Sequence, residues 1–374
     1  MKILFIVGSL EPGKDGVGDY TRSLASECGR RAHQTFLMSL NDSWVDKPSR
    51  GNQLLRLPST MPWASRIKTG RTFVTENHPD VISLQYVPYS FHPAGLSFAL
   101  PTIMQAIIGR VPSHLMLHEL WIGSQIDAPL KVKVFGFCQR KIIKSLIKGM
   151  ACRTIHTSNA VYARLLSRHG VHAKILPLFG SVPVMPNAVV ARRDDNALRL
   201  GLFGSIHPEW QPDELFARLQ AFGKPIRVCH IGRIGLGESL WNEVVERYEG
   251  EIQFQRLGEQ SFEKISQFFL SVDLGLATTP LSLIGKSSTV AAMLDHGLPV
   301  IVSRNDVHFR GIAEDPPSER LIRIDESFVD RVKAVKRLDA DPSLPRIAKQ
   351  FLSDLASRWS ETRLHSPGTG GEIY

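Results

Sequence analysis

The sequence predicts an α/β protein with two doubly wound domains, and three observations support this prediction. Short apolar runs alternate with amphipathic stretches along most of the 374 residues, as strands and helices do in parallel sheets. The alternation starts again near residue 198, after a stretch without periodicity. Hydrophobic residues make up 43% of the chain and charged residues 22%, which is typical of globular domains and provides for two cores.

Residues 280–299 form the strand–helix–strand unit around which the second domain is organised. Apolar runs at 274–277 and 299–303 predict buried parallel strands on either side of one helix. The helix start offers three capping hydroxyls, those of Ser287, Ser288 and Thr289. A helix N-terminus at the carboxyl edge of a sheet favours phosphate, and Lys286 adds a full positive charge there. This pattern predicts an anion site; taken alone, the segment is also explained by an ordinary capped loop with a solvated lysine.

The chain begins with a second candidate phosphate loop. Residues 2–8 predict a strand, residues 13–18 a glycine-rich turn and residues 19–31 a helix. The glycines do not fit the dinucleotide-binding pattern, and no acidic residue closes a second strand about 20 residues on. The alternative is a turn that needs positive φ at Gly16 or Gly18.

A histidine at a strand end is the next candidate site residue. Further strands are predicted at 35–40, 54–57, 81–87, 114–120, 154–158 and 174–178, with helices at 64–76, 96–109 and 160–169. His118 and Glu119 close the strand at 114–120. Because ligands of α/β proteins bind at strand carboxyl ends, His118 is a candidate site residue. A structural histidine bonded to nearby backbone or carboxylates is the alternative.

The positive charge is concentrated in the first half of the chain. Residues 1–190 hold 22 Lys and Arg against 10 Asp and Glu, a net +12, and the remainder holds 23 against 26, a net −3. Residues 131–153 carry seven basic residues and no acidic one, beside an apolar stripe of Ile142, Ile143, Leu146 and Ile147. Such a helix is typical of an anionic membrane surface, with a solvated basic face as the alternative. The aromatic clusters and Arg/Gly runs of a nucleic-acid binder are missing.

The second series of elements places more candidates at a sheet edge. Strands are predicted at 198–203, 226–231 and 252–257, with helices near 212–221, 238–248 and 262–270. The residues that follow or end these strands, on the side of the Lys286 loop, are Gly204, Ser205, Arg233, Arg256 and Leu257. The expected organisation is a domain at 1–183, a linker at 184–197, a domain at 198–344, a C-terminal helix at 345–361 that packs towards the first domain, and a disordered tail at 362–374.

The remaining composition argues against several classes of protein. No apolar run approaches the length of a membrane span, and residues 1–8 are too short for a signal-peptide core, so we expect a cytoplasmic protein. The four cysteines lie far apart without a C-x-x-C pair. Neither a metal site nor a disulfide framework is therefore expected.

Several segments resemble, in the right order, motifs of the large retaining GT-B glycosyltransferase family (the glycogen-synthase-like group 1). These segments are residues 16–25, 81–89, 117–119, 157–160 and 291–300. The resemblance implies two Rossmann-like domains facing across a cleft, with a nucleotide diphosphate sugar of the UDP or GDP type mainly on the second domain and the acceptor mainly on the first. It implies retention of the anomeric configuration and no obligatory metal or cofactor.

The resemblance also assigns roles to residues. His118 matches the family histidine beside the donor sugar, while Lys286, the amides of Ser287 to Thr289 and those around Gly16 and Gly18 would face the diphosphate. The paired glutamates of the family fall on Ile284 and Ala292, so neither carboxylate is present. The family's Arg and Lys after the first strand of the second domain fall near Ser205 and Gln211, which leaves Lys286 and Arg233 as substitutes.

The function implied is sugar transfer from a nucleotide diphosphate sugar to a sugar, lipid-linked or small-molecule acceptor in glycan, polysaccharide or glycolipid synthesis. The protein would be cytoplasmic, with possible contact at the inner face of the membrane. The main alternative is a degenerate GT-B scaffold or partner subunit that binds nucleotide without turnover. A nucleotide-sugar 2-epimerase shares the architecture, whereas an NAD-dependent oxidoreductase would need a dinucleotide fingerprint that the chain lacks.

Overall fold

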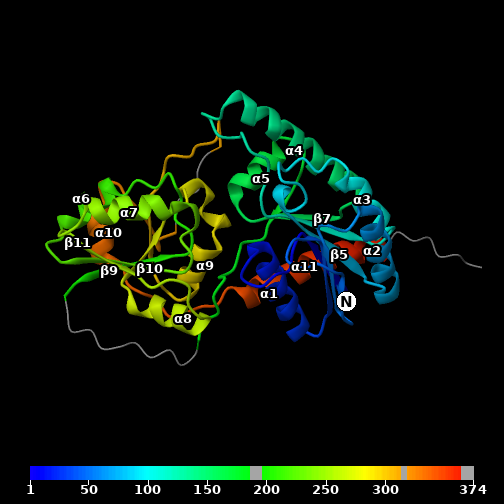
Figure 1. Ribbon diagram of the computed structural model, residues 1–374, viewed down its shortest axis with the longest axis horizontal. Helices are drawn as coiled ribbons and strands as arrows, with labels where there is room; N and C mark the ends of the chain where they lie inside the picture. The colour runs from blue at the N-terminus through cyan, green and yellow to red at the C-terminus, as the bar shows by residue number, and fades with distance from the viewer. Residues whose placement is uncertain (186–195, 313–317, 364–374) are drawn as a thin grey trace, which may run out of the picture. The chain divides into compact units, whose positions relative to one another are not determined.

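The computed structural model describes residues 1–185, 196–312 and 318–363. They form two compact units (Figure 1), each of which is described by itself. The N-terminal unit comprises residues 1–158 and 162–176 together with the C-terminal segment from Leu344, and the C-terminal unit comprises residues 159–161 and 177–343. Most of the linker expected at 184–197, and the tail from residue 364, lie outside the described residues.

The N-terminal unit is built on an eight-stranded sheet in the order β3-β4-β2-β1-β5-β6-β7-β8. Only β3 runs antiparallel, to its neighbour β4. The strands are β1 (Lys2–Val7), β2 (Gln34–Asp42), β3 (Ser49–Arg50), β4 (Leu54–Pro58), β5 (Val81–Tyr86), β6 (Ser113–Leu117), β7 (Thr154–Thr157) and β8 (Lys174–Ile175). The central strands β5 and β6 are buried at every position, which explains their many apolar residues. Four polar residues of these strands are buried with them, namely Ser83, Gln85, Ser113 and His114.

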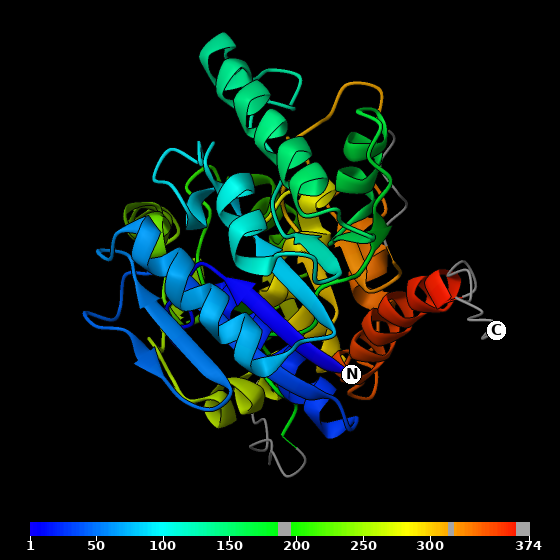
Figure 2. The ribbon, with the colours of Figure 1, turned by 90° about the vertical axis from the view of Figure 1, so that its right-hand side faces the viewer.

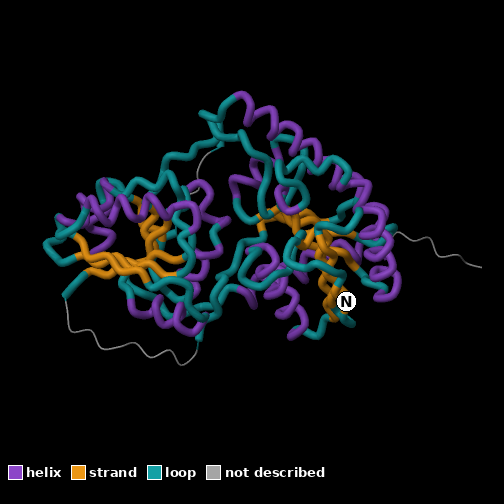
Figure 3. Tube along the Cα trace, in the orientation of Figure 1, coloured by secondary structure: helices purple, strands orange, loops and turns teal. Residues whose placement is uncertain are grey.

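Helices lie on both sides of this sheet (Figure 3). They are α1 (Gly16–Arg30), α2 (Trp63–Asn77), α3 (Leu100–Ile108), α4 (Leu130–Gly149), α5 (Ala160–Ser167) and α11 (Leu344–Arg363), with the 3₁₀ turn η1 (Pro88–Ser90). The helix α11 comes from the opposite end of the chain and packs against α1 and β7. Phe351 of α11 stacks on Phe5 of β1 with ring centroids 5.7 Å apart, so this helix is part of the N-terminal core.

The C-terminal unit has a fully parallel six-stranded sheet in the order β11-β10-β9-β12-β13-β14. Its strands are β9 (Leu198–Phe203), β10 (Ile226–Ile231), β11 (Ile252–Arg256), β12 (Leu274–Ala277), β13 (Val300–Val302) and β14 (Leu321–Arg323). Its helices are α6 (Asp213–Gln220), α7 (Glu238–Arg247), α8 (Phe262–Ser271), α9 (Ser288–Asp295) and α10 (Phe328–Ala334), with the 3₁₀ turns η2 (Gly235–Gly237) and η3 (Leu281–Lys286). The predicted strand–helix–strand unit is confirmed as β12, α9 and β13.

Several predicted bounds differ from the structure for local reasons. The helix expected from residue 96 begins at Leu100, because Pro101 takes a first-turn position where its missing N–H costs nothing. The last N-terminal strand, expected over 174–178, ends at Ile175, just before Pro177. The helix expected to end at residue 361 continues to Arg363. The three-residue strand β14 and the short helix α10 were not predicted, since segments this short carry no measurable periodicity.

The apolar stripe of α4 faces the core of its unit and not the surface, where a helix on a membrane would present it. Ile142, Ile143 and Leu146 are only 2%, 1% and 0% exposed, so they belong to the core and cannot meet a membrane. Gly136 lets the helix approach closely here, because a Cβ at this position would lie only 1.8 Å from the carbonyl oxygen of Ile122. The interpretation of this stripe as a lipid-facing surface is therefore wrong.

Candidate functional site

A serine side chain caps the start of α9. Ser287 is the N-cap, and its Oγ accepts a hydrogen bond from the Val290 amide at 3.3 Å and lies 2.9 Å from Thr289 Oγ1. The amides of Ser288 and Thr289 occupy the first two helical positions, whose N–H groups have no partner within a helix. Lys286 precedes the cap and is partly buried. Two backbone donors and one cation thus lie at the carboxyl edge of β12.

The loops after β9 and β10 approach this helix start through glycines. Gly204 has φ of 78°, and a Cβ there would lie 3.2 Å from Thr289 Cγ2. Gly232, with φ of 94°, lies directly beside Gly204. Ser205 lies close to Gly235 in the same way. The structure therefore brings Gly204, Ser205 and Thr289 together at one sheet edge, where the missing side chain of Gly204 permits the close approach of Thr289.

Arg304 is a buried cation at this edge that was not predicted. It follows β13 and is 4% exposed. Its guanidinium pairs with Asp306 at 2.5 Å and Glu209 at 2.9 Å, and among the described residues its Nη1 has no hydrogen-bond partner. Burial, together with the positive charges of Arg304 and Lys286, lowers the pKa of His207. The signal available in the sequence was the position of Arg304 two residues after an apolar run.

The other predicted C-terminal residues are engaged elsewhere. Arg233 is exposed and forms a two-point pair with Glu259 at 3.0 and 3.2 Å. Arg256, also exposed, pairs with Glu238. Leu257 donates its amide to His230 and packs its side chain against the hydrophobic core. In this conformation the two guanidinium groups are held by carboxylates.

The two positions that match the paired glutamates carry no polar group. Ile284 packs against the hydrophobic core in η3, and Ala292 of α9 is 0% exposed. A Cβ at Gly180 would lie 2.8 Å from the Cα of Ala292, so the chain runs directly over this position. A glutamate at residue 292 would not fit without displacing that segment.

His118 lies immediately after β6, within the N-terminal unit. It is 7% exposed, its Nε2 is 2.8 Å from Gln85 Oε1, and its ring meets the edge of Tyr20 with centroids 4.8 Å apart. Burial lowers the pKa of His118 to about 3, so the imidazole is neutral. No hydrogen bond among the described residues uses its Nδ1.

The first glycine loop is closed by an aspartate. Asp15 caps α1 and accepts a hydrogen bond from the Gly18 amide at 2.8 Å and a second from the Val17 amide. Gly18 is needed because a Cβ would lie 2.6 Å from the carbonyl oxygen of Ser9, whereas Gly16 faces open space. Burial raises the pKa of Asp15. Its carboxyl group occupies the position that an anion would need at this helix start.

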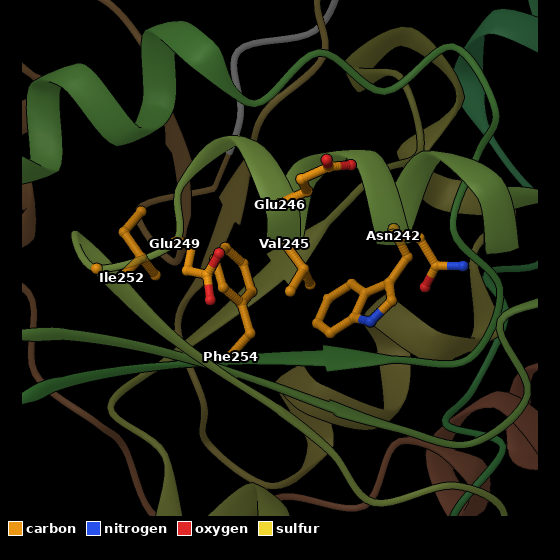
Figure 4. Close-up of a pocket in the computed structure, with 8 residues that line it drawn as sticks. Asn242, Val245, Glu246, Glu249, Ile252 and Phe254 are labelled. Carbon is orange, nitrogen blue, oxygen red and sulfur yellow. The ribbon is translucent and has the colours of Figure 1, made fainter.

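One hollow of about 400 Å³ lies away from these residues (Figure 4). It is lined by α7 and the start of β11, with Trp241, Glu246, Glu249 and Phe254 among its residues. The start of β11 is at the amino edge of the parallel sheet, opposite to the edge that holds Gly204 and Thr289. Two carboxylates at its mouth would repel a phosphate, so we do not assign the nucleotide to this hollow.

Two negative results concern the described residues only. Within 1–185, 196–312 and 318–363, no cluster of three or more His, Cys, Asp or Glu is suited to hold a metal ion. Across the same described ranges, none of the helices has both the length and the hydropathy to span a membrane.

Neither a protein-family model nor a curated protein sequence matches the chain. Solved structures, in contrast, define its fold as GT-B, the fold of two Rossmann-like α/β domains. The apo form of the lipopolysaccharide outer core galactosyltransferase WaaB is similar with a TM-score of 0.55 and 12% identity, over 97% of this chain and 100% of that one. Anabaena Alr3699/HepE in complex with UDP-glucose is similar with a TM-score of 0.55 and 14% identity, over 96% and 100%.

A structure described as a putative UDP-N-acetylglucosamine 2-epimerase from Listeria monocytogenes is equally similar, with a TM-score of 0.56 and 11% identity over 100% of this chain and 99% of that one. At these identities the likeness concerns the fold alone. Transferases and epimerases both share it, so the activity has to be argued from the site.

Proposed function

We propose that the protein is a glycosyltransferase that moves a sugar from a nucleotide diphosphate sugar to an acceptor in glycan, polysaccharide or glycolipid synthesis. The observation that carries the proposal is the C-terminal edge itself. The amides of Ser288 and Thr289 at the helix start, Lys286 and the buried Arg304 lie at the carboxyl edge of this sheet, together with the loop glycines Gly204 and Gly232. We refer to this set as the diphosphate edge. Its donors and charges suit a diphosphate and occur in a fold whose solved members include transferases.

The proposed chemistry is electrostatic. When the bond between the anomeric carbon and the phosphate oxygen breaks, negative charge grows on the leaving diphosphate and positive charge on the sugar. Preorganised donors and cations stabilise that separation and need no reorganisation during the reaction. Lys286 and the Ser288 and Thr289 amides would take this role. Arg304 would join them if the diphosphate displaces Glu209 or Asp306 from its guanidinium.

The donor is proposed to carry UDP, because HepE, which shares the fold, was solved in complex with UDP-glucose. A donor that carries GDP is the alternative that the test below can detect. The acceptor is assigned to the N-terminal domain, and His118 is assigned to the donor sugar. Since Asp15 closes the first glycine loop, we assign Gly18 to the close approach of α1 and not to phosphate binding. Retention of configuration is implied by the resemblance alone.

The test begins with binding. Thermal shift against UDP-, GDP-, ADP- and dTDP-sugars should single out one base, since a ligand at 100 times its Kd stabilises by about 2.7 kcal/mol. Lys286→Ala should reduce that shift, while Lys264→Ala, which removes an exposed lysine of the same unit, should leave it unchanged. A panel without any shift contradicts the proposal.

Turnover then separates the alternatives. A transferase releases nucleoside diphosphate only with an acceptor, and NMR of the product reports the anomeric configuration. Epimerisation of UDP-N-acetylglucosamine without an acceptor would identify the epimerase. Binding without turnover against sugar, lipid-linked and small-molecule acceptors would favour the scaffold.

We also propose that α4 docks on an anionic membrane, through a face other than the predicted stripe. Leu130, Val134 and Phe137 are 79%, 55% and 49% exposed and recur at helical spacing. The same face continues into the exposed Lys141, Lys144 and Lys148. Figure 2 shows one end of α4 extending past the other helices of its unit. An apolar tip followed by a basic row is suited to insert among lipids and contact their anionic headgroups.

Arg140 lies at the border of this membrane face and is engaged within the unit. Its guanidinium bonds to His169 at 2.9 Å and lies over the Trp121 ring. It also borders the face at Phe137, whose ring centroid is 5.4 Å from the Arg140 guanidinium carbon, so we leave Arg140 unchanged in the test. The three lysines contribute about 1 kcal/mol each near an anionic bilayer, so replacing all three with glutamate should reduce vesicle binding by more than 100-fold. The same change at Lys224, Lys264 and Lys336, three exposed lysines of the C-terminal unit, is the charge-matched control.

The measurement is co-sedimentation with phosphatidylcholine vesicles, with and without phosphatidylglycerol. Binding should need the anionic lipid and weaken at high salt, because exposed charges are screened within about 10 Å at 0.1 M. Phe137→Ser should also weaken it. A protein that stays in the supernatant at low salt would point to a soluble acceptor.

A further inference from the structure

A continuous row of hydrogen-bonded polar side chains crosses the N-terminal unit beneath His118. It joins α11, β7, β6 and β5, and its members inside the sheet are between 0% and 7% exposed. The contacts, in order, are Asp354 Oδ2 to His156 Nε2 at 3.0 Å, His156 Nδ1 to His114 Nε2 at 2.9 Å, His114 Nδ1 to Ser83 Oγ at 2.8 Å, Ser83 Oγ to Gln85 Nε2 at 2.7 Å, and Gln85 Oε1 to His118 Nε2 at 2.8 Å.

Asp354 determines which way the hydrogens point at one end of this row. Its other oxygen lies 2.5 Å from Lys174 Nζ. Burial raises the pKa of Asp354, but the hydrogen bonds from Lys174 and His156 hold it below its ordinary value, so the carboxylate is ionised and accepts only. His156 must therefore donate from Nε2. A neutral imidazole has a single N–H, so His156 Nδ1 is left as an acceptor.

The same reasoning assigns the donor and the acceptor atom of each following residue in the row. His114 donates from Nε2 to His156, so its Nδ1 accepts from the Ser83 hydroxyl. Having used its only hydrogen, Ser83 Oγ accepts from the Gln85 amide nitrogen. The amide oxygen of Gln85 then faces His118, which must carry its hydrogen on Nε2. One orientation satisfies all five contacts, and it leaves His118 Nδ1 as an acceptor.

Burial keeps the three histidines neutral, which this orientation requires. It lowers the pKa of His118 to about 3 and that of His114 well below its ordinary range, with help from the neighbouring rings. It also lowers the pKa of His156, against the opposing effect of Asp354.

We propose that Asp354, through this row, sets the tautomer of His118, and that His118 Nδ1 accepts a hydrogen bond from a hydroxyl of the sugar substrate. The second part rests on the proposed function; the first does not. An acceptor nitrogen selects a group with a hydrogen to give and disfavours a phosphate, carboxylate or carbonyl oxygen at the same place. Asp354 is thus a positioning residue. The row does not conduct protons, because the amide of Gln85 interrupts it.

The sharpest test replaces one oxygen atom. In Asp354→Asn the side chain keeps its shape but has one oxygen and one NH₂ group. The Lys174 ammonium can only donate, so it will hold the oxygen and turn the NH₂ towards His156. His156 Nε2 must then accept, which reverses the contacts as far as Ser83 Oγ. If Gln85 kept its orientation, Ser83 Oγ would accept from both neighbours and its own buried hydrogen would lose its partner. Reversal of the remaining contacts restores that partner in Gln85 Oε1, so we expect the hydrogen of His118 to move from Nε2 to Nδ1. Adding Lys174→Met removes this constraint, so the double variant should regain the original tautomer.

The readout is the ¹⁵N spectrum of the ring nitrogens in ¹⁵N-histidine-labelled protein, with the His118 signals assigned from His118→Gln. Gln350→Ala is the matched control, because Gln350 joins the same helix to Ile175 without entering the row. We expect Nε2–H in the wild type, in the control and in the double variant, and Nδ1–H in Asp354→Asn. A wild type with Nδ1–H, or an unchanged Asp354→Asn spectrum, overturns the role of Asp354.

Turnover tests the second part. Asp354→Asn should lower kcat/KM for the donor by roughly tenfold to hundredfold, the effect of leaving one buried polar pair unmade, with UDP binding unchanged and recovery in the double variant. A reversed tautomer with unchanged kcat/KM would overturn the hydroxyl contact alone. Absence of turnover in the wild type would contradict the proposed function and the hydroxyl contact, while the spectra still decide the role of Asp354.

Discussion

Mild acid should destabilise the N-terminal unit through its buried histidines. The pKa of His118 falls from its ordinary 6.5 to about 3 in the folded protein, and those of His114 and His156 are lowered in the same direction. Below pH 6.5 the unfolded chain therefore binds protons that the folded unit does not. Stability is fully present above pH 6.5 and is lost as the pH falls towards the folded pKa values.

The magnitude follows from the size of the shift. At pH 5 the unfolded His118 is almost fully protonated and the folded one is not, which costs about 2 kcal/mol relative to pH 7. His114 and His156 add to this loss. Most carboxyl groups titrate at lower pH, so the window from pH 6.5 to 5 isolates the histidines.

The assay is urea unfolding at pH 7 and pH 5, read by a brief hydrogen-exchange pulse at fixed conditions and mass spectrometry of peptides from residues 1–176, which report on the N-terminal unit. His118→Gln should lose about 2 kcal/mol less than the wild type between the two pH values. His172→Gln, which removes an exposed histidine of the same unit, should behave like the wild type. Equal losses in wild type and His118→Gln would mean that the folded imidazole titrates normally, and the reasoning from burial would fail.

Three further variants follow from individual contacts. Lys286→Ala should weaken nucleotide-diphosphate binding by about 1–3 kcal/mol in calorimetry, as expected when a charge-assisted contact is lost; unchanged affinity would remove Lys286 from the diphosphate edge. His118→Ala should reduce turnover and leave bare nucleotide binding nearly intact, because its contact is to the sugar; equal loss of both with a lower Tm would favour a structural histidine. Asp295→Ala should destabilise the C-terminal unit by about 1–3 kcal/mol. The reason is that its buried carboxyl group accepts hydrogen bonds from the Gly180 amide at 3.1 Å and from Ser343 Oγ at 2.9 Å. An unchanged midpoint of urea unfolding would contradict this prediction.

The sequence was sufficient for the fold because the decisive signals are local. Continuous apolar strands, the Ser287 cap and the helix end at His296 and Gly297 depend on neighbouring residues only, and the structure has them where they were expected. The apolar stripe of α4 shows the limit of such reasoning. Periodicity identified the apolar face of this helix correctly, but whether such a face meets lipid or the core of its own unit follows from tertiary contacts, which are not visible in the sequence.

The site was predictable only in part, for the same reason. Gly204 and Thr289 were both expected at a sheet edge, yet their proximity follows from the β9–β12 pairing. Arg233 was expected at the same edge, but the structure pairs its exposed guanidinium with Glu259, which the sequence does not show. The row that ends at Asp354 joins residues up to 271 positions apart along the chain, and nothing in the pattern around His118 indicates it.

Two cations of the glycosyltransferase family that the sequence resembles are missing here, which bears on whether the protein is active. The resemblance places an Arg and a Lys after the first strand of the second domain, where this chain has Ser205 and Gln211. Lys286 follows β12 and Arg304 follows β13, and the three strands β9, β12 and β13 are consecutive in a parallel sheet. Lys286 therefore supplies a cation at the same edge from a different loop, and Arg304 adds a second one when the diphosphate displaces Glu209 or Asp306 from its guanidinium. Because stabilisation of a leaving diphosphate depends on where charge lies and not on which strand supplies it, loss of the family positions does not by itself argue for a scaffold without turnover.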